Sequence, residues 1–305
     1  MTEQLIRPPF PEVVDSTIIA AFRSCPRKAY LEFFEHWRGK DPNVHLHAGA
    51  AYAKGLEVAR RAFYEDGKSA TDAEALGLRS LLESYGDFQC PEDSAKSASR
   101  TAGALEFYFD RYPLGSDRAI PIELPGGRRA IEIGGVEPLD IAHPVTGNPI
   151  QYSWRMDVAV EYNGMRLGAD DKTASQLGAS WPRQWDLRSQ FTAYVWGGKK
   201  YGIELNGFLV RGVSILKTKY DTLEAITYRP DWQIDRWYEQ VLRDLKRMIA
   251  CWQEGYFDYA LDHACVEYGG CPFRQVCLTR DPESVLNGLF ERRRWDPVTR
   301  TETKL

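Results

Sequence analysis

Residues 154–174 read "WRMDVAVEYNGMRLGADDKTA", and this stretch decides the fold. Two runs of alternating apolar and polar residues stand on either side of Asn163-Gly164, the strongest short-range signal for a two-residue β-hairpin turn. If Tyr162 opposes Met165, the same register brings Asp157 opposite Asp170. The sequence therefore predicts a hairpin whose register is fixed.

The alternation gives the hairpin two faces. The apolar face is expected to pack on the core and carries Trp154, Met156, Val158, Val160, Tyr162, Met165, Leu167 and Ala169. The charged face carries Arg155, Asp157, Asp170 and Lys172, whereas Asp171 points to the opposite side. Two carboxylates are thus predicted to meet beside one lysine.

Like charges opposed across two strands repel each other unless something compensates them. A divalent cation would do so, because magnesium accepts one or two carboxylates and manganese takes similar ligands. Lys172 is then placed to position a nucleophilic water or to stabilise charge developing on a phosphorus. The alternative is a solvated sheet face whose charges are balanced by Arg155 and Glu161.

The rest of the chain predicts helices around a mixed sheet. We expect helices over 15–37, 48–67, 71–86, 94–112, 186–200 and 231–255, and strands over 119–124, 129–135, 152–162, 165–170, 207–216 and 224–229. This order indicates an α/β fold with a helical N-terminal subdomain. We divide one integrated domain into 1–115, a core over 116–230, and a C-terminal helix with a cysteine-rich region over 231–305.

Composition limits the function classes. The 305 residues are 43% hydrophobic and carry a net charge of −4, so bulk charge would not draw the chain to nucleic acid or an anionic membrane. Neither a secretory leader nor an apolar run long enough to span a membrane is visible. The expectation is a soluble cytoplasmic protein with no membrane partner.

Six cysteines in such a chain are better read for metal or redox chemistry than for disulfides. Cys265, Cys271 and Cys277 stand at equal intervals in a segment rich in glycine and proline, which favours metal ligation. Spacing alone does not choose between zinc and an iron–sulfur cluster. Cys90 and Cys251 read as unligated thiols.

Two of these segments carry a family resemblance. "WRMDVAVEYNGMRLGADDKTAS" and "SQFTAYVWG" resemble consecutive blocks of the PD-(D/E)XK nuclease superfamily, in its RecB-type exonuclease branch, which includes CRISPR-associated and phage-encoded nucleases with four cysteines. The resemblance covers most of the chain and implies a restriction-endonuclease-like mixed sheet. It implies metal binding by Asp157 and Asp170, catalysis by Lys172, and substrate contacts from Gln190 and Tyr194.

A third segment, "AGAAYAKGLEVARRAFY", resembles a helical motif of the same branch, with Gly49 and Glu57 in register. The resemblance implies that Glu57 assists in metal binding. Ala53 stands where the branch has a metal-binding histidine, and His45 and His47 lie more than one helical turn away. One expected ligand is therefore missing.

The resemblance also chooses between the metals. Its iron–sulfur members close a 4Fe-4S cluster with three C-terminal cysteines and one from an upstream "CPRK"-like motif, which here is "CPRKAY" with Cys25. The implied cluster ligands are Cys25, Cys265, Cys271 and Cys277. Closing a loop of some 240 residues would remove much entropy from the unfolded chain, on the order of several kcal/mol in the simple loop model.

These patterns together predict a metal-dependent DNA exonuclease that hydrolyses phosphodiester bonds with Mg²⁺ or Mn²⁺ and carries a structural 4Fe-4S cluster. Its partner would be DNA, single-stranded or with free ends, whose backbone local basic residues such as Arg23, Arg27, Lys28, Lys199 and Lys200 would follow. One alternative is a non-catalytic nucleic-acid-binding or recruitment protein, inactive because Ala53 replaces the histidine. Another is a redox protein that uses the cluster.

Overall fold

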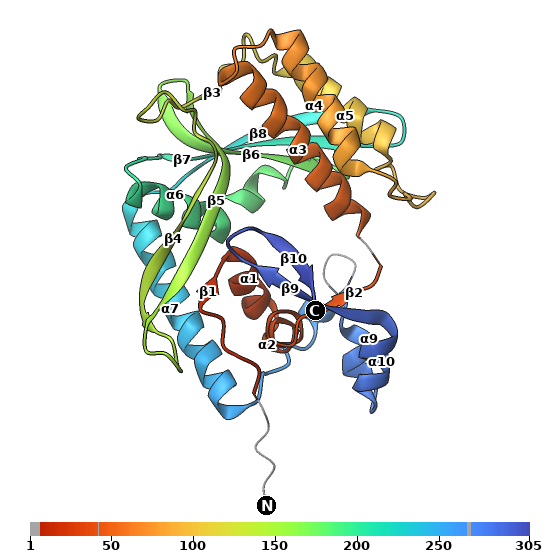
Figure 1. The fold of residues 1–305 in the computed structure, drawn as a ribbon, viewed down its shortest axis with the longest axis vertical. Helices are drawn as coiled ribbons and strands as arrows, with labels where there is room; N and C mark the ends of the chain where they lie inside the picture. Colours follow the sequence, from red (N-terminus) through yellow and green to blue (C-terminus); the bar gives the residue numbers. More distant parts are fainter. Residues whose placement is uncertain (1–6, 42, 267–269) are drawn as a thin grey trace, which may run out of the picture. The chain divides into compact units, whose positions relative to one another are not determined.

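The computed structural model describes residues 7–41, 43–266 and 270–305. These residues form two compact units (Figure 1). The first unit comprises the described parts of 1–42, 135–154 and 235–305, and the second comprises 43–134 and 155–234. Residues 1–115, expected as one subdomain, are therefore divided between the two units. Each unit is described below by itself.

The second unit is built on a mixed sheet of long strands. These are β4 (Ile131–Ala142) and β5 (Pro149–Tyr162), which also extend into the first unit, together with β6 (Met165–Ala174), β7 (Gly207–Ile215) and β8 (Tyr220–Tyr228). β5 and β6 are antiparallel, β6 and β7 are parallel, and β7 and β8 are antiparallel. β4 and the short β3 (Ile120–Pro121) pair with β5. The predicted α/β class with a mixed sheet is confirmed.

The β5–β6 hairpin has the predicted turn. Asn163 and Gly164 both adopt left-handed backbone angles, with φ of 49° and 78°, as a type I′ turn requires. The pairing runs from Tyr162 opposite Met165 to Val158 opposite Ala169. The predicted register is therefore confirmed over the paired part of the hairpin.

The two strands part immediately beyond that pairing. The β5–β6 register ends at Val158 and Ala169, whereas β6 continues beside β7 as far as Ala174 opposite Ser214. Asp157 and Asp170 are the next residues on the two strands. The carboxylates thus lie where one strand leaves the other, at a fork in the sheet.

The side chains of β5 do not alternate as predicted. Adjacent residues of β7 define the two faces, because the Phe208 ring stacks on Phe191 at 4.5 Å while Leu209 belongs to a core cluster on the other side. Val158 packs in the cluster of Leu209. A Cβ atom built on Gly198, in the same helix as Phe191, would instead lie 3.5 Å from the methyl carbon of Met156.

Met156 and Val158 therefore lie on opposite faces, and the prediction that they share one face is wrong. Residues two apart on a regular strand point the same way, so the direction reverses around Asp157. Irregularities of this kind are frequent next to active sites, where they redirect a side chain. The reversal turns Asp157 toward groups on both sides of the sheet.

Helices cover both faces of this sheet. α3 (Val44–Tyr64), α4 (Ala70–Tyr85) and α5 (Ala98–Arg111) form one core with Val213 and Ile215 of β7. α6 (Ser189–Lys200) follows the 3₁₀ turn η2 (Pro182–Trp185) and packs on Phe208. Side chains of Asn43, Ser69 and Ser97 cap the first three helices, so each begins within a few residues of its predicted start.

The first unit contains short elements from both ends of the chain. From its N-terminal segment come β1 (Val13–Val14), α1 (Ser16–Ser24), α2 (Pro26–Ala29), the π-helix η1 (Tyr30–Phe34) and β2 (Trp37–Gly39). From its C-terminal segment come most of α7 (Asp231–Glu254), then α8 (His263–Val266), α9 (Arg274–Leu278), α10 (Pro282–Leu289), β9 (Phe290–Asp296) and β10 (Thr301–Lys304). β2, β9 and β10 form a three-stranded antiparallel sheet.

The uninterrupted helix predicted over 15–37 is wrong. Asp15 caps α1 as expected, but Cys25 is extended, with φ −160° and ψ 113°, and separates α1 from α2. A proline disfavours helical angles in the residue before it, so Pro26 ends α1 at this point. In the described residues, no helix has the length and apolarity that a membrane span requires.

α3 and α4 meet at backbone distance. A Cβ atom on Gly55 would lie 2.9 Å from the carbonyl oxygen of Gly77, and one on Gly77 would lie 2.7 Å from that of Gly55. Neither oxygen can move without its helix. The pair therefore sets how closely α3 approaches its neighbour.

We predict that Gly55→Ala or Gly77→Ala destabilises the protein by about 1 to 3 kcal/mol, because each inserts a methyl group against rigid backbone. Gly288→Ala is the matched control, since that helical glycine faces open space and alanine favours helix. Urea unfolding followed by circular dichroism measures both. Equal midpoints for all three variants would contradict the close approach.

Candidate active site

Asp170 and Lys172 form the centre of the site. They lie two residues apart on β6, and the Lys172 Nζ stands 2.6 Å from the Asp170 Oδ1. The Asp170 side chain is 3% exposed, whereas that of Lys172 is 34% exposed. A buried carboxylate is thus in contact with an ammonium group that solvent and ligands reach.

Asp157 is the second carboxylate. Burial, and after it the charge of Asp170, raise the pKa of Asp157 to about 8, although Lys172 acts in the opposite direction. Burial by itself would lower the pKa of Lys172, but the charges of Asp170 and Asp157 raise it above its ordinary value. Two aspartates and a charged lysine therefore form one electrostatic group, and a cation bound there would favour the ionised form of Asp157.

α6 brings Tyr194 to the same group. Tyr194 is buried, and it is among the groups that raise the pKa of Lys172. Its ring centroid lies 5.8 Å from that of Phe208. Gln190 lies one turn earlier on α6 and is half-buried. The predicted tyrosine is thus near the lysine, with the glutamine on the same helix.

A small cavity of about 10 Å³ lies beside Asp157. Its other lining residues come from α3, from β4 and from β6, and they are Ala53, Leu56, Glu57, Arg60, Ile131, Glu132 and Asp171. Ala53, at the position where a histidine was expected, therefore faces Asp157 across this cavity. α3 thus brings Ala53 and Glu57 to the cavity that Asp157 of β5 lines.

Glu57 is already engaged by two cations on α3. It accepts hydrogen bonds from the Lys54 Nζ at 2.9 Å and from the Arg61 Nε at 3.2 Å. Burial would raise the pKa of Glu57, but these two partners lower it below the ordinary value. Glu57 thus lines the cavity with its negative charge balanced by Lys54 and Arg61.

Asp171 is held on the α3 side of the sheet. The Arg60 guanidinium donates to its Oδ2 at 2.6 Å and to the Tyr108 hydroxyl at 2.9 Å. Arg211 donates to the same hydroxyl at 3.2 Å and pairs with Asp117. The side chain of Asp171 is therefore committed to a buried network, although it also lines the small cavity.

Glu132 is a site residue that the sequence reasoning missed. Its φ is +51°, which is uncommon for a residue with a side chain and costs on the order of 1 to 3 kcal/mol. Its Oε2 accepts from the Arg155 Nε at 2.6 Å, and its charge helps to raise the pKa of Asp157. No sequence pattern marks a strained glutamate within a strand.

The two nearby histidines are directed elsewhere. The His47 Nε2 is 2.8 Å from the Tyr85 carbonyl oxygen, and its ring stacks on Phe88 at 4.1 Å. His45 is exposed at the start of α3. Neither histidine takes the place that Ala53 leaves in the cavity lining.

All four predicted cluster cysteines belong to the first unit. Burial raises the pKa of Cys271 and Cys277, and each is raised further by the charges of Cys25 and Cys265. The Cys271 backbone N–H donates to the Cys265 carbonyl oxygen at 3.1 Å. Among the described residues, no three His, Cys, Asp or Glu side chains are grouped to hold a metal ion.

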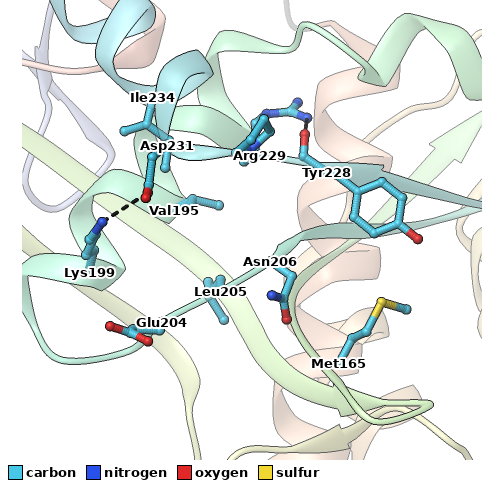
Figure 2. A pocket seen from close by; sticks show the side chains of 11 residues that line it. Met165, Val195, Lys199, Glu204, Leu205, Asn206, Tyr228, Arg229, Asp231 and Ile234 are labelled. Carbon is cyan, nitrogen blue, oxygen red and sulfur yellow. Dashed lines mark hydrogen bonds and ion pairs between the residues drawn. The ribbon is translucent and has the colours of Figure 1, made fainter.

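A larger pocket, of about 670 Å³, lies elsewhere in the second unit (Figure 2). It is lined by Met165 at the start of β6, whereas Asp170 and Lys172 lie near the other end of that strand. Lys199 is paired there with Asp231 at 3.0 Å, and Glu204 adds a second negative charge. This pocket is larger, but neither Asp157 nor Asp170 lines it, so the chemistry is assigned to the fork.

Two solved structures are distantly similar to this chain. No family model and no curated protein matches the chain. A solved structure from Eubacterium rectale named "Putative exonuclease" is 14% identical over 88% of this chain and 93% of that one, with a TM-score of 0.47. A second, SSO0001, is 14% identical over 63% and 74%, with a TM-score of 0.27. Similarity at this level assigns no activity.

The raised pKa of Asp157 predicts a pH dependence of stability. Between the ordinary value of 3.8 and about 8, the folded state holds a proton that the unfolded chain has lost. This contribution is complete below about pH 4 and is lost as the pH rises toward 8. Relative to Asp157→Asn, the wild type without divalent cations should lose up to about 1.4 kcal/mol of unfolding free energy per pH unit.

Urea midpoints of the two proteins, measured in EDTA from pH 4.5 to 8.5, provide the test. Curves that stay parallel across this range would mean that Asp157 is ionised throughout.

Proposed function

We propose that this chain is a metal-dependent deoxyribonuclease that hydrolyses phosphodiester bonds from DNA ends. One observation carries the proposal: β5 and β6 separate at Asp157 and Asp170, where the charged Lys172 contacts the buried Asp170. This arrangement resembles what a phosphodiesterase needs, namely a divalent-cation site with a fixed positive group beside it.

The donor set fits a hard divalent cation. Magnesium is held in proteins by one or two carboxylates, and manganese accepts the same oxygen ligands. Asp157 and Asp170 supply two carboxylates, and a bound cation would oppose the burial and the charge of Asp170 that raise the pKa of Asp157. When bound, Mg²⁺ or Mn²⁺ would polarise the phosphoryl oxygens and favour formation of hydroxide.

Each protein group then has a role. Lys172 stays protonated because two carboxylates surround it, so it can hold the attacking water and stabilise negative charge that develops on the phosphate. Tyr194 and Gln190, from α6, would orient the scissile strand. Glu57 is already paired with Lys54 and Arg61, so we assign it an assisting role.

We also propose a structural 4Fe-4S cluster on Cys25, Cys265, Cys271 and Cys277. A single ion needs ligands that converge on one point, whereas a four-iron cluster binds each thiolate through its own iron. After burial, the charges of the other three cysteines raise the pKa of Cys277, yet no three of the described His, Cys, Asp or Glu side chains converge on one point. The four cysteines therefore suit the second case better. The cluster would join α2, which follows Cys25, to the segment that contains α8 and α9.

The activity is tested with purified protein and end-labelled DNA, single- and double-stranded, in Mn²⁺ or in EDTA. Metal-dependent shortening from the labelled or the opposite end supports the exonuclease. A mobility shift without cleavage in Mn²⁺ would instead identify a nucleic-acid-binding protein on the same fold. Opposite end labels give the polarity of digestion.

Two adjacent aspartates provide a matched pair of variants. Asp170→Asn removes a carboxylate in contact with Lys172, so cleavage should fall about a hundredfold or more, and Lys172→Met should do the same. Asp171→Asn alters a carboxylate paired with Arg60, so it should cost stability while folded protein retains substantial activity. Single-turnover cleavage rates of the two variants provide the test. An inactive Asp171→Asn together with an active Asp170→Asn would overturn our site assignment.

Two cysteine variants test the cluster proposal. Protein purified without oxygen should be brown, and Cys25→Ala should lose the colour and much of its solubility. Cys90→Ala should keep both, because Cys90 lies in the second unit, before α5. Iron, zinc and sulfide analysis accompanies the spectra, and stoichiometric zinc without iron would contradict the proposal.

A further inference from the structure

We propose that Glu132 is a third carboxylate ligand of the cation site. It would replace the metal ligand that Ala53 cannot provide. This inference rests on the proposed function, because it adds a ligand to the same cation. Nothing in the sequence pattern points to Glu132. The case for it comes from one free oxygen atom, a cavity and the charges that surround it.

Glu132 has one oxygen engaged and one available. The Nε and Nη2 atoms of Arg155 both lie 2.6 Å from its Oε2. No described residue makes a hydrogen bond or ion pair with its Oε1. Carboxylates that bind metals are commonly held in this way by a partner on their second oxygen. Arg155 therefore fixes the side chain while leaving a ligand atom free.

The cavity beside Glu132 has the right size and the right neighbours. Its volume of about 10 Å³ matches roughly one water molecule or one small ion. Asp157 lines it, and no described residue makes a hydrogen bond or ion pair with the Asp157 carboxylate. Ala53 lines it too, with a methyl group that ligates nothing. Glu132 is thus on the same cavity as a ligand proposed on independent grounds.

The remaining carboxylates of that cavity are already neutralised. Glu57 is paired with Lys54 and Arg61, and Asp171 is paired with Arg60. Among the described residues, no protein cation contacts Asp157, and Glu132 keeps its Oε1 free of one. Asp171 also keeps its Oδ1 free, but Arg60 already holds and balances that side chain. On the other side of Asp157, the buried Asp170 Oδ1 accepts no well-directed hydrogen bond, although Lys172 is close to it.

The backbone of Glu132 adopts an angle that most residues with a side chain avoid. A left-handed φ within a strand favours glycine, yet a glutamate stands here. Strained angles of this kind persist where the surroundings hold them, and they cluster at ligand sites. Glycine would relieve the strain but would provide no carboxylate.

The test measures Mn²⁺ binding alone, by the electron paramagnetic resonance signal of free Mn²⁺ in titrations of protein freed of metal. Glu132→Gln should weaken binding about 10- to 100-fold, a loss typical of metal-site residues. Glu161→Gln is the control, because it makes the same change at an exposed position on β5. It should alter the affinity less than twofold.

A rescue separates ligation from a through-space charge effect. Ala53→His places a neutral nitrogen ligand on the same cavity, so the Glu132→Gln, Ala53→His double variant should recover at least tenfold in affinity. A neutral imidazole at pH 8 cannot restore a lost negative charge. Absence of recovery would therefore show that Glu132 acts only through its charge, and the inference would fail.

The remaining outcomes distinguish this inference from the proposed function. If Glu132→Gln binds Mn²⁺ as the wild type does while Asp157→Asn does not, then Glu132 is not a ligand and the nuclease proposal stands. If the wild type itself binds no Mn²⁺, the cation site and both proposals are overturned. Circular dichroism of each variant ensures that only folded protein is compared.

Discussion

The contact between Lys172 and Asp170 holds the whole candidate site together. A carboxylate that is 3% exposed keeps its charge only if a cation or several donors stand beside it. Removing Lys172 would leave the buried Asp170 carboxylate without its cation, so the lysine supports the fold as well as any chemistry. Asp157 adds a second acid that this single lysine cannot satisfy. Without a bound cation, Asp157 therefore holds a proton up to about pH 8.

β6 serves two separate purposes through its two faces. On one face Asp170 and Lys172 form the reactive group, and on the other Asp171 anchors the strand to α3 through Arg60. Arg60 shares the Tyr108 hydroxyl with Arg211, which ties the anchor to α5 and β7. Three successive residues are thus fixed from opposite sides. A site on a strand held in this way needs little reorganisation to act.

Features of the fold that depend on local chemistry could be predicted from sequence. Asn163-Gly164 fixed the turn and the register, because both residues tolerate left-handed angles. The reversal at Asp157 could not be foreseen, because strict alternation gives no signal for an irregular residue. The break at Cys25 was missed although Pro26 marks it, since the apolar helical pattern continues past it. Glu132 depends on tertiary contacts, and its strained backbone has no sequence signature.

The first unit draws its core from both ends of the chain. Leu31 and Trp37 share one apolar cluster with Phe273, Val276 and Phe290. About 250 residues separate β2 from β9, so a ribosome adding roughly 5 to 20 residues per second takes on the order of ten to fifty seconds between them. During that interval the nascent N-terminal segment exposes its apolar side chains to water. The wait makes this early segment a natural client for a chaperone.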